Sequence, residues 1–511
     1  MKILDCTLRD GGYYTNWDFK RNLVDTYIKS LNSLPIDYIE IGYRSIPLEG
    51  YYGEYFYLPI YVLERLKSQS SKKLVVILNE KDVRPEQVQD LLLPCVGLID
   101  MVRIAIDPEK FERALKLASA IKKMGFEVGF NVMYMSNWKN QKNFLEILPE
   151  VKGIADYFYM VDSYGGIYPQ DLKETIQLVK SYISDVPLGF HGHNNLELAL
   201  VNTITAIDEG CEIVDSTITG MGRGAGNLKT ELLLTALSAK GILEVDFNSL
   251  SKVVDGFTEL QEKHQWGTNL PYMVSGAHSL PQKEVMDWVG KRYYSFNSII
   301  RALQQQVKGN IDILSINTWS PIIQSDKVII VGGGESVNEN KEAIIYFLNN
   351  NKEVSVIHAS SKNALTFSNI TNPQYFCLVG NEGYRMEEVF NGELPSNVIC
   401  VLPPSPRKMG TYIPSMLLNK SVELSQDTFS KEYIDSHCFI ALQVAKNLNS
   451  KSIYLLGFDG YSKIKMDEKA QELFAENIYL FKKFETETNL RLTSLNETSY
   501  PLIPSSIFSL V

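Results

Sequence analysis

Three side chains that lie far apart in the sequence have the types and spacing of metal ligands. Asp10 lies in the segment Thr-Leu-Arg-Asp-Gly-Gly at positions 7–12, and His191 and His193 flank Gly192 about 180 residues further on. Histidines two positions apart on a β-strand point to the same face. One carboxylate and two imidazoles would leave about half of an octahedral divalent ion open to water or substrate. We therefore predict that Asp10, His191 and His193 bind one divalent metal ion.

Arg9, the neighbour of Asp10, adds a permanent positive charge at the place where a developing oxyanion could be held. Each segment also has a purely structural interpretation. The first could be a strand-to-turn segment, and the second could be two histidines on a surface strand. Because both occur in one chain, we favour the metal site and predict a catalytic role for Arg9.

Length and composition indicate an ordinary globular protein of two or three domains. The chain has 511 residues, of which 45% are hydrophobic and 22% are charged. The formal net charge of −10 argues against nucleic acid or an anionic membrane as the main partner.

Targeting signals and cysteine motifs are absent from the sequence pattern. No basic segment followed by an apolar run opens the chain, and no stretch reaches the ~18 apolar residues that span a bilayer. The six cysteines show no CxxC spacing, which argues against a disulfide framework and a cysteine-based zinc site. We expect a cytoplasmic protein.

Eight short apolar runs, separated by segments with helical spacing, fill the first 265 residues. This alternation is typical of an α/β fold, and eight repeats in about 250 residues are typical of a (β/α)8 TIM barrel. Strands that are apolar nearly throughout fit a parallel sheet covered by helices. The predicted strands are Lys2–Leu8, Tyr38–Ser45, Leu74–Asn79, Ile99–Ile106, Glu127–Tyr134, Tyr157–Tyr164, Leu188–Asn194 and Glu212–Gly220.

Polar side chains follow or end most of these runs. Active sites of such barrels form at the carboxyl ends of the strands. We expect the following residues to gather at that rim: Arg9, Asp10, Glu40, Arg44, Asn79, Arg103, Asn131, Asp162, Ser163, His191 and His193.

Three separated motifs resemble those of the DRE-TIM metallolyases, and within them the 4-hydroxy-2-oxovalerate aldolase-like branch. The TLRDG signature is present at residues 7–11 and the HxHN element at residues 191–194. The glycine-rich loop after strand eight begins at Asp215 and continues through Gly220, Gly222 and Gly226 to Asn227. These motifs occur in the family's order and cover about half of the chain.

The resemblance implies a TIM barrel with one divalent ion, Mn2+ or Mg2+, on Asp10, His191 and His193. Asn227 matches a metal ligand of some members. Arg9 would stabilise an enolate, and Ser163 matches a position that contacts the carboxylate of a 2-oxo acid. Glu40 and Arg103 match substrate-binding positions less closely and could instead brace the barrel interior.

The implied activity is that of a metal-dependent aldolase or carbon–carbon lyase that acts through a pyruvate enolate. Pyruvate would chelate the ion, which acts as a Lewis acid, and the partners would be a small 2-oxo acid and an aldehyde. Two alternatives stay open. One is a Claisen-type condensation of a 2-oxo acid with acyl-CoA, and the other is a non-catalytic barrel that serves as a scaffold for a sugar- or nucleotide-binding C-terminal domain. Family members are often dimers, so the resemblance allows a homodimer.

One departure from the family concerns the general base. Aldolases of this branch carry a histidine three residues after the metal-binding aspartate, and this chain has Tyr13 there. A phenol with a pKa near 10 is a poor base at neutral pH unless its surroundings perturb it. We rank Tyr13 first as the proton carrier by position. Tyr14 or a water on the metal could also move the proton, and both tyrosines could simply line the pocket.

The remaining chain is predicted to form a helical extension, residues 266–324, and a Rossmann-like α/β domain, residues 325–511. In the aldolase branch a tyrosine of such an extension reaches the active site, and Tyr272 is our match. The loop Gly332-Gly333-Gly334 could cradle a phosphate at a helix start. It departs from the dinucleotide fingerprint, because Val337 occupies the third glycine position and His358 ends the second strand. We therefore predict no NAD site.

Overall fold

The computed structural model describes residues 1–291, 296–307, 316–321, 324–391, 397–407, 411–461 and 468–511. The chain forms two compact units, Met1–Met286 and Asp287–Val511. Each is described by itself. The predicted boundaries at 265/266 and 324/325 remain predictions, and residues 292–295, 308–315 and 322–323 of the predicted extension lie outside the described residues.

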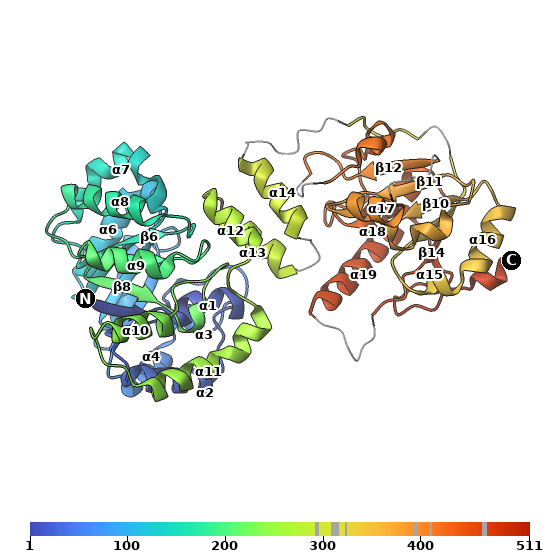
Figure 1. Ribbon diagram of the computed structural model, residues 1–511. Coiled ribbons are helices and arrows are strands. Elements are labelled where there is room, and N and C mark those ends of the chain that lie inside the picture. Colours follow the sequence, from blue (N-terminus) through green and yellow to red (C-terminus); the bar gives the residue numbers. More distant parts are fainter. Residues whose placement is uncertain (292–295, 308–315, 322–323, 392–396, 408–410, 462–467) are drawn as a thin grey trace. The chain divides into compact units, whose positions relative to one another are not determined.

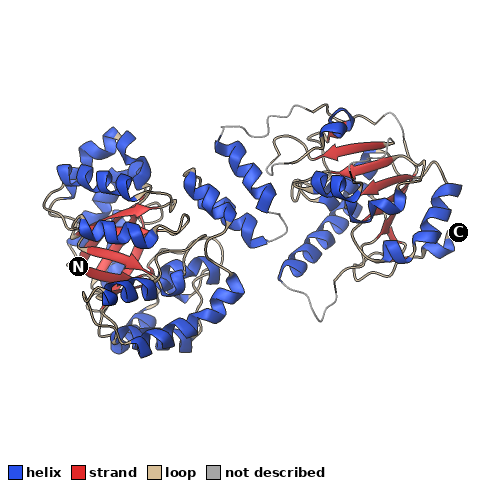
Figure 2. Ribbon diagram, viewed as in Figure 1, coloured by secondary structure: helices blue, strands red, loops and turns tan. Residues whose placement is uncertain are grey.

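The first unit is a closed barrel of eight parallel strands surrounded by helices, which confirms the predicted TIM barrel (Figures 1 and 2). Each strand pairs with the next along the chain, and β1 closes the barrel against β8. The strands are β1 (Lys2–Asp5), β2 (Tyr38–Tyr43), β3 (Lys73–Asn79), β4 (Met101–Ile106), β5 (Glu127–Val132), β6 (Tyr157–Asp162), β7 (Leu188–Gly192) and β8 (Ile213–Ser216).

The helices of this unit complete the βα repeats and extend beyond them. They are α1 (Thr7–Thr15), α2 (Arg21–Asn32), α3 (Glu54–Tyr57), α4 (Ile60–Gln69), α5 (Val88–Leu92), α6 (Phe111–Lys122), α7 (Lys142–Ile147), α8 (Pro169–Tyr182), α9 (Ala199–Asp208), α10 (Thr230–Ala239), α11 (Phe247–His264) and α12 (Leu270–Ala277). Helix α13 (Gln282–Lys291) begins in this unit and continues past its last residue, Met286.

Strand β4 shows how the alternation of side chains builds two different layers. Val102, Ile104 and Ile106 belong to the large apolar core between the sheet and the helices. Met101 points the other way, into a small apolar cluster inside the barrel, and Arg103 lies on the same interior face. The barrel interior therefore has an apolar floor with charged side chains above it.

The first strand is shorter than predicted, because residues 7–8 begin a helix. The Asp5 carboxylate accepts hydrogen bonds from the main-chain N–H and the hydroxyl of Thr7, at 2.9 and 2.5 Å, which turns the chain out of the strand. Two glycines let α1 pack closely. A Cβ at Gly12 would lie 2.1 Å from the Trp17 ring, and one at Gly11 would lie 2.5 Å from the Met221 sulfur. The predicted continuation of strand one to Leu8 is therefore wrong.

The second unit contains an eight-stranded parallel sheet in the order β13-β12-β11-β10-β9-β14-β15-β16. Its strands are β9 (Lys327–Val331), β10 (Ser355–His358), β11 (Gln374–Cys377), β12 (Val398–Leu402), β13 (Ser421–Glu423), β14 (Ser452–Leu456), β15 (Leu492–Ser494) and β16 (Ile503–Pro504). Its helices are α14 (Phe296–Val307), α15 (Ser336–Glu339), α16 (Lys341–Asn350), α17 (Glu382–Val389), α18 (His437–Asn447) and α19 (Glu468–Thr488).

Helices cover both faces of this sheet, so the second unit is a three-layer α/β structure (Figure 2). Val328 and Ile330 of β9 pack with side chains of α18 and α19. Ile329 and Val331 of the same strand pack with side chains of α16 on the other face. Strands β13, β15 and β16 are short, and the sequence pattern did not predict them.

Candidate active site

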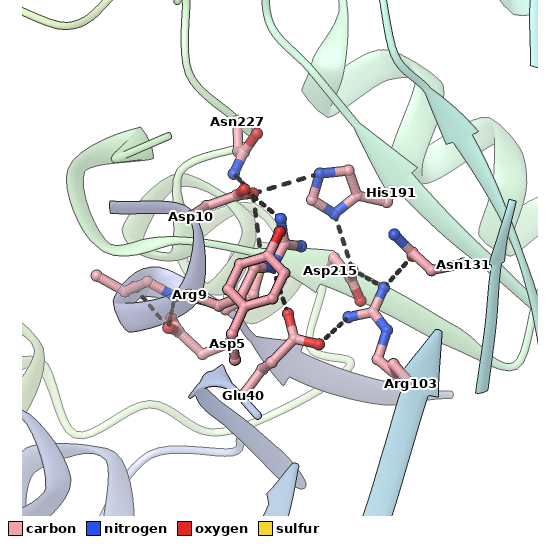
Figure 3. Close-up of polar contacts among 12 residues, drawn as sticks. Asp5, Arg9, Asp10, Glu40, Arg103, Asn131, His191, Asp215 and Asn227 are labelled. Carbon is pink, nitrogen blue, oxygen red and sulfur yellow. Dashed lines mark hydrogen bonds and ion pairs between the residues drawn. The ribbon is translucent and has the colours of Figure 1, made fainter. Parts of the chain in front are cut away.

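The three predicted metal ligands come together at the carboxyl end of the barrel. Asp10 lies in α1, His191 lies in β7, and His193 directly follows β7 (Figure 3 shows the first two). One ligand atom from each of the three residues lies within 4.8 Å of the others. The Asp10 Oδ2 to His191 Nε2 distance is 3.5 Å, and the two imidazole rings are 4.9 Å apart.

Both imidazoles are held in the orientation that a metal ligand needs. His191 Nδ1 lies 2.8 Å from Asp215 Oδ2, and His193 Nδ1 lies 2.8 Å from the main-chain oxygen of Asp162. These acceptors hold the Nδ1–H of each ring, which leaves the Nε2 lone pair of each histidine available. The donor set of one carboxylate and two oriented imidazoles therefore fits a divalent metal ion.

Asn227 lies next to this cluster of Asp10, His191 and His193. Its Nδ2 donates a 2.6 Å hydrogen bond to Asp10 Oδ2, and an isolated bridge joins its backbone to His193. Its Oδ1 is buried and has no hydrogen-bond partner among the described residues. The oxygen and nitrogen of an amide exchange places by a simple flip of the group. Asn227 thus lies within reach of the position that a ligand oxygen would occupy.

A second group of side chains, Cys6, His191 and Asp215, also has the spacing of a metal site. Burial raises the pKa of the Cys6 thiol well above its ordinary value. A thiol that stays protonated is a poor ligand. The set that contains Asp10 has no thiol, and it is therefore the better candidate.

A continuous network of charged groups links Arg9 to His191 through the barrel interior (Figure 3). Arg9 forms ion pairs with Asp10 and, through Nε at 2.6 Å, with Glu40. Arg103 lies 3.4 Å from the other Glu40 oxygen and 2.6 Å from Asp215 Oδ2. Asp215 in turn holds His191. Glu40 and Arg103 are thus engaged in ion pairs inside the barrel, and contact of either residue with a substrate stays a prediction.

The network sets the charge of each member. Burial by itself raises the pKa of Asp10, but Arg9, the two histidines and the Asn227 hydrogen bond together outweigh burial and leave the pKa of Asp10 below its ordinary value. Burial likewise raises the pKa of Asp215, but Arg103 and His191 together outweigh burial, so the pKa of Asp215 is also lowered. Burial, with the neighbouring His191, lowers the pKa of His193 to about 3, and the charge of Arg223 acts in the same direction. At neutral pH the cluster offers an anionic carboxylate and a neutral His193 ring.

Arg9 keeps one donor group uncommitted. Its Nε and Nη1 are engaged with Glu40 and Asp10, whereas its buried Nη2 has no hydrogen-bond partner among the described residues. A buried donor without a partner costs stability unless another group engages it. This N–H group is therefore available for an oxygen of a bound substrate.

Tyr13 lies at the rim beside this cluster. Its hydroxyl is 3.2 Å from the Tyr43 hydroxyl, and its ring packs edge-on against Trp17. The guanidinium of Arg223 stands over the same ring, 5.6 Å from its centre. Tyr14 has a different environment: its hydroxyl donates to the Gly224 main-chain oxygen, and burial raises its pKa to about 12.

Ser163 and Tyr272 are both buried close to the rim. The Ser163 hydroxyl accepts a 2.9 Å hydrogen bond from the Tyr134 main-chain N–H. The Tyr272 main-chain oxygen accepts hydrogen bonds from Asn195 and Ser275. A Cβ at Gly224 would lie 3.4 Å from the Tyr272 ring, so this ring packs against the loop that follows β8. Substrate contact by either residue stays a prediction.

The candidate site residues predicted from the sequence omitted Asp215, Asn131 and Asp162. Asp215 orients His191, Asn131 accepts a hydrogen bond from Arg103, and the Asp162 main chain orients His193. Asp215 opens the strand-eight motif, and the other two lie at predicted rim positions. The sequence could have identified all three residues as part of the site, because side chains at the carboxyl ends of the barrel strands lie close together.

In the second unit, the Asp459 carboxylate occupies the space beside the loop Gly332-Gly333-Gly334. Asp459, which follows β14, accepts hydrogen bonds from the Ser336 main-chain N–H and hydroxyl and from the Asn496 side chain. A Cβ at Gly334 would lie 2.4 Å from Asp459 Oδ2. A phosphate in this loop would face a negative charge, so the predicted phosphate cradle does not fit this arrangement.

The chain belongs to the HMGL-like family, whose model matches residues 97–256. The chain is 31% identical to a 4-hydroxy-2-oxovalerate aldolase of Thermomicrobium roseum over 255 residues, 47% of this chain and 67% of the relative. It is 28% identical to an oxaloacetate decarboxylase of Mycobacterium tuberculosis over 347 residues, 64% of this chain and 96% of the relative.

A solved structure matches the same part of the chain. It is the N-terminal domain of a Bacteroides vulgatus protein described as a candidate aldolase, with 60% identity and a TM-score of 0.57. The match covers 59% of this chain and all of that domain. These comparisons confirm the predicted family resemblance. No helix among the described residues is long and apolar enough to cross a membrane.

Proposed function

We propose that the barrel unit is a divalent-metal-dependent aldolase or carbon–carbon lyase that acts on a 2-oxo acid. The observation that carries this proposal is the uncommitted, buried Nη2 of Arg9 beside a cluster of one carboxylate and two oriented imidazoles. The names of the two relatives support it, because both substrates named there are 2-oxo acids.

The proposed metal is Mn2+ or Mg2+, held by Asp10, His191 and His193, with Asn227 as a further ligand. When bound, such an ion supplies a Lewis acid that polarises the carbonyl of a 2-oxo acid and lowers the energy of its enolate. Oxygen and imidazole donors without a thiolate suit these ions.

Arg9 would donate from Nη2 to the oxygen on which negative charge develops as the carbon–carbon bond breaks. Its position is fixed beforehand by the ion pairs with Asp10 and Glu40. A donor that is already in place requires no reorganisation during the reaction, and this makes its stabilisation of the transition state large. The ion pair between Arg103 and Glu40 would keep the network rigid.

Tyr13 is the proposed carrier of the proton that leaves or enters the substrate hydroxyl. It takes the place of the family's histidine and lies at the rim within hydrogen-bond distance of Tyr43. The further proposed roles are a contact of Ser163 with the substrate carboxylate and a contact of Tyr272 with the substrate at the rim.

Exchange of the C3 protons of pyruvate in deuterated water, followed by NMR, tests the proposal without knowledge of the second substrate. The protein loaded with Mn2+ is expected to exchange these protons, and treatment with a chelator is expected to abolish the exchange. Metal analysis of the purified protein should find one ion per chain. A metal-loaded protein that leaves the pyruvate protons in place would refute the aldolase assignment.

A further inference from the structure

Arg223 occupies a distinctive place in the loop that follows β8. The glycine before it packs against the proposed metal cluster: a Cβ at Gly222 would lie 2.6 Å from Asn227 Nδ2. The glycine after it is tied to the rim, because the Gly224 main-chain oxygen accepts a 3.1 Å hydrogen bond from the Tyr14 hydroxyl. Arg223 is thus fixed on both sides, between the cluster and the rim.

The guanidinium of Arg223 has no acidic partner in the part of the chain that the structure describes. It is half-buried, and its contact with the described residues is the one over the Tyr13 ring, at 5.6 Å. No carboxylate of the described residues lies within ion-pair distance of it. Arg9 and Arg103, the other arginines of this region, are each paired with two carboxylates. The charge of Arg223 is therefore available to an anion other than the carboxylates of the described residues.

The position of this charge relative to Arg9 suggests what the anion is. In the proposed function the 2-oxo acid end of the substrate lies at Asp10 and Arg9, inside the barrel. The far end of the substrate then reaches the rim, where Tyr13 and Arg223 lie. A single guanidinium with its planar donors matches one carboxylate, and it binds a carboxylate more strongly than a neutral group.

We propose that Arg223 binds a second carboxylate of the substrate, so that the preferred substrates are 2-oxo acids that carry a further carboxylate on the fragment that is released. This inference rests on the proposed function. It makes Arg223 a specificity-determining residue, and it distinguishes this enzyme from an aldolase for substrates that end in a methyl group.

A pair of substrates that differ at one end tests the inference. The first is 4-hydroxy-2-oxoglutarate, which ends in a carboxylate, and the second is 4-hydroxy-2-oxovalerate, which ends in a methyl group. The wild-type protein should have the higher kcat/KM for the first. In Arg223→Gln the ratio of the two kcat/KM values should fall by about 10- to 100-fold. Arg223→Lys, which keeps the charge, should restore part of the ratio.

Two controls separate this inference from the proposed function. Lys152→Gln removes one charge from the barrel unit at an exposed position before β6, and the ratio should stay as in the wild type. Pyruvate C3 exchange is measured for each variant, because it detects a general loss of activity that does not depend on the far end of the substrate. Absence of exchange in the wild type refutes the proposed function. Exchange together with equal kcat/KM values for the two substrates, or with a ratio that Arg223→Gln leaves unchanged, refutes the role of Arg223.

Discussion

The 2.8 Å contact between His191 Nδ1 and Asp215 Oδ2 determines which nitrogen of the His191 ring faces Asp10. The same carboxylate oxygen also accepts from Arg103. Asp215 therefore belongs to the proposed metal site and to the ion pairs of the barrel interior at once. A change at Asp215 should affect metal binding without removing a metal ligand.

Asp215→Asn is expected to lower the affinity for Mn2+ by about 10- to 100-fold, because the His191 ring loses the carboxylate that orients it. Calorimetric titration of the metal-free protein with Mn2+ measures this effect. Asp185→Asn is a suitable control, since Asp185 forms an exposed ion pair with Lys152. An unchanged affinity in Asp215→Asn would show that the interior network does not support the metal site.

Arg9→Lys is expected to retain the metal but to lose catalysis. Lysine keeps the positive charge beside Asp10, yet it cannot contact Asp10, Glu40 and a substrate oxygen with one planar group. Removal of one preorganised donor to a developing oxyanion lowers kcat by about 100- to 1000-fold. The measurement is the rate of pyruvate C3 exchange at saturating Mn2+, together with the metal content. Full activity in Arg9→Lys would mean that charge alone is sufficient.

Tyr13→Phe distinguishes a proton carrier from a side chain that lines the pocket. If the Tyr13 hydroxyl transfers the proton, cleavage of the substrate should slow by about 100-fold or more. Loss of packing alone would change the rate only slightly, because the ring remains. Tyr168→Phe, at an exposed position, is the control. A rate within about threefold of the wild type would assign the proton to another group.

The barrel was predictable because its signal is local and repeated. Apolar runs such as residues 101–106 alternate with amphipathic segments, and the parallel barrel follows from eight such repeats. The ends of the strands were less predictable. Residues 7 and 8 look like strand, but the hydrogen bonds of Thr7 to Asp5 and the close packing of Gly11 and Gly12 turn this segment into a helix. Of these contacts, the one between Gly11 and Met221 joins residues that are far apart in the sequence, so no local pattern reveals it.

The metal ligands of the candidate site were predictable from the sequence, but the ion pairs that surround them were not. Asp10, His191 and His193 have distinctive types and spacing, so the sequence alone singled them out. The ion pair between Arg103 and Glu40 depends on the register of β2 and β4, which no local pattern reveals. The position of Arg223 depends in the same way on how the loop after β8 folds over α1.

Gly42 lies at an irregularity of β2, two residues after Glu40. The register of β2 against β3 shifts between Glu40 and Gly42, and Gly42 has a φ of +150°. A Cβ at Gly42 would lie 2.0 Å from the Tyr55 main-chain oxygen. Gly42→Ala should therefore destabilise the protein by about 3 kcal/mol and weaken Mn2+ binding.

The matched control for Gly42→Ala is Gly97→Ala. Gly97 also has a positive φ, +81°, but a Cβ there would meet no atom within 4 Å. Only backbone strain remains, which costs about 1 kcal/mol. Urea unfolding of both variants measures the difference. Equal stabilities would show that the Tyr55 main chain moves aside without cost.

His358 gives the second unit a predictable dependence on pH. Burial lowers the pKa of His358 to about 4, and its Nε2 contacts the Gln374 side chain at 2.8 Å. Above the ordinary pKa of 6.5 both the folded and the unfolded chain hold a neutral ring, so His358 has no effect there. Below pH 6.5 the His358 ring is protonated in the unfolded chain, whereas in the folded chain it stays neutral down to about pH 4. Stability is therefore lost as the pH falls through this window, by about 2 kcal/mol at pH 5.

Urea unfolding of the full chain at pH 8 and pH 5 checks this prediction. If the two units unfold in separate transitions, the transition that His358→Gln shifts is assigned to the second unit. His358→Gln should be less stable than the wild type at pH 8, because the packing of the ring on Phe376 is lost. Between pH 8 and pH 5, however, the variant should lose about 2 kcal/mol less than the wild type. His278→Gln, at an exposed position, should follow the wild type. If the wild type and His358→Gln lose the same free energy over this range, the folded unit accommodates a charged ring at His358.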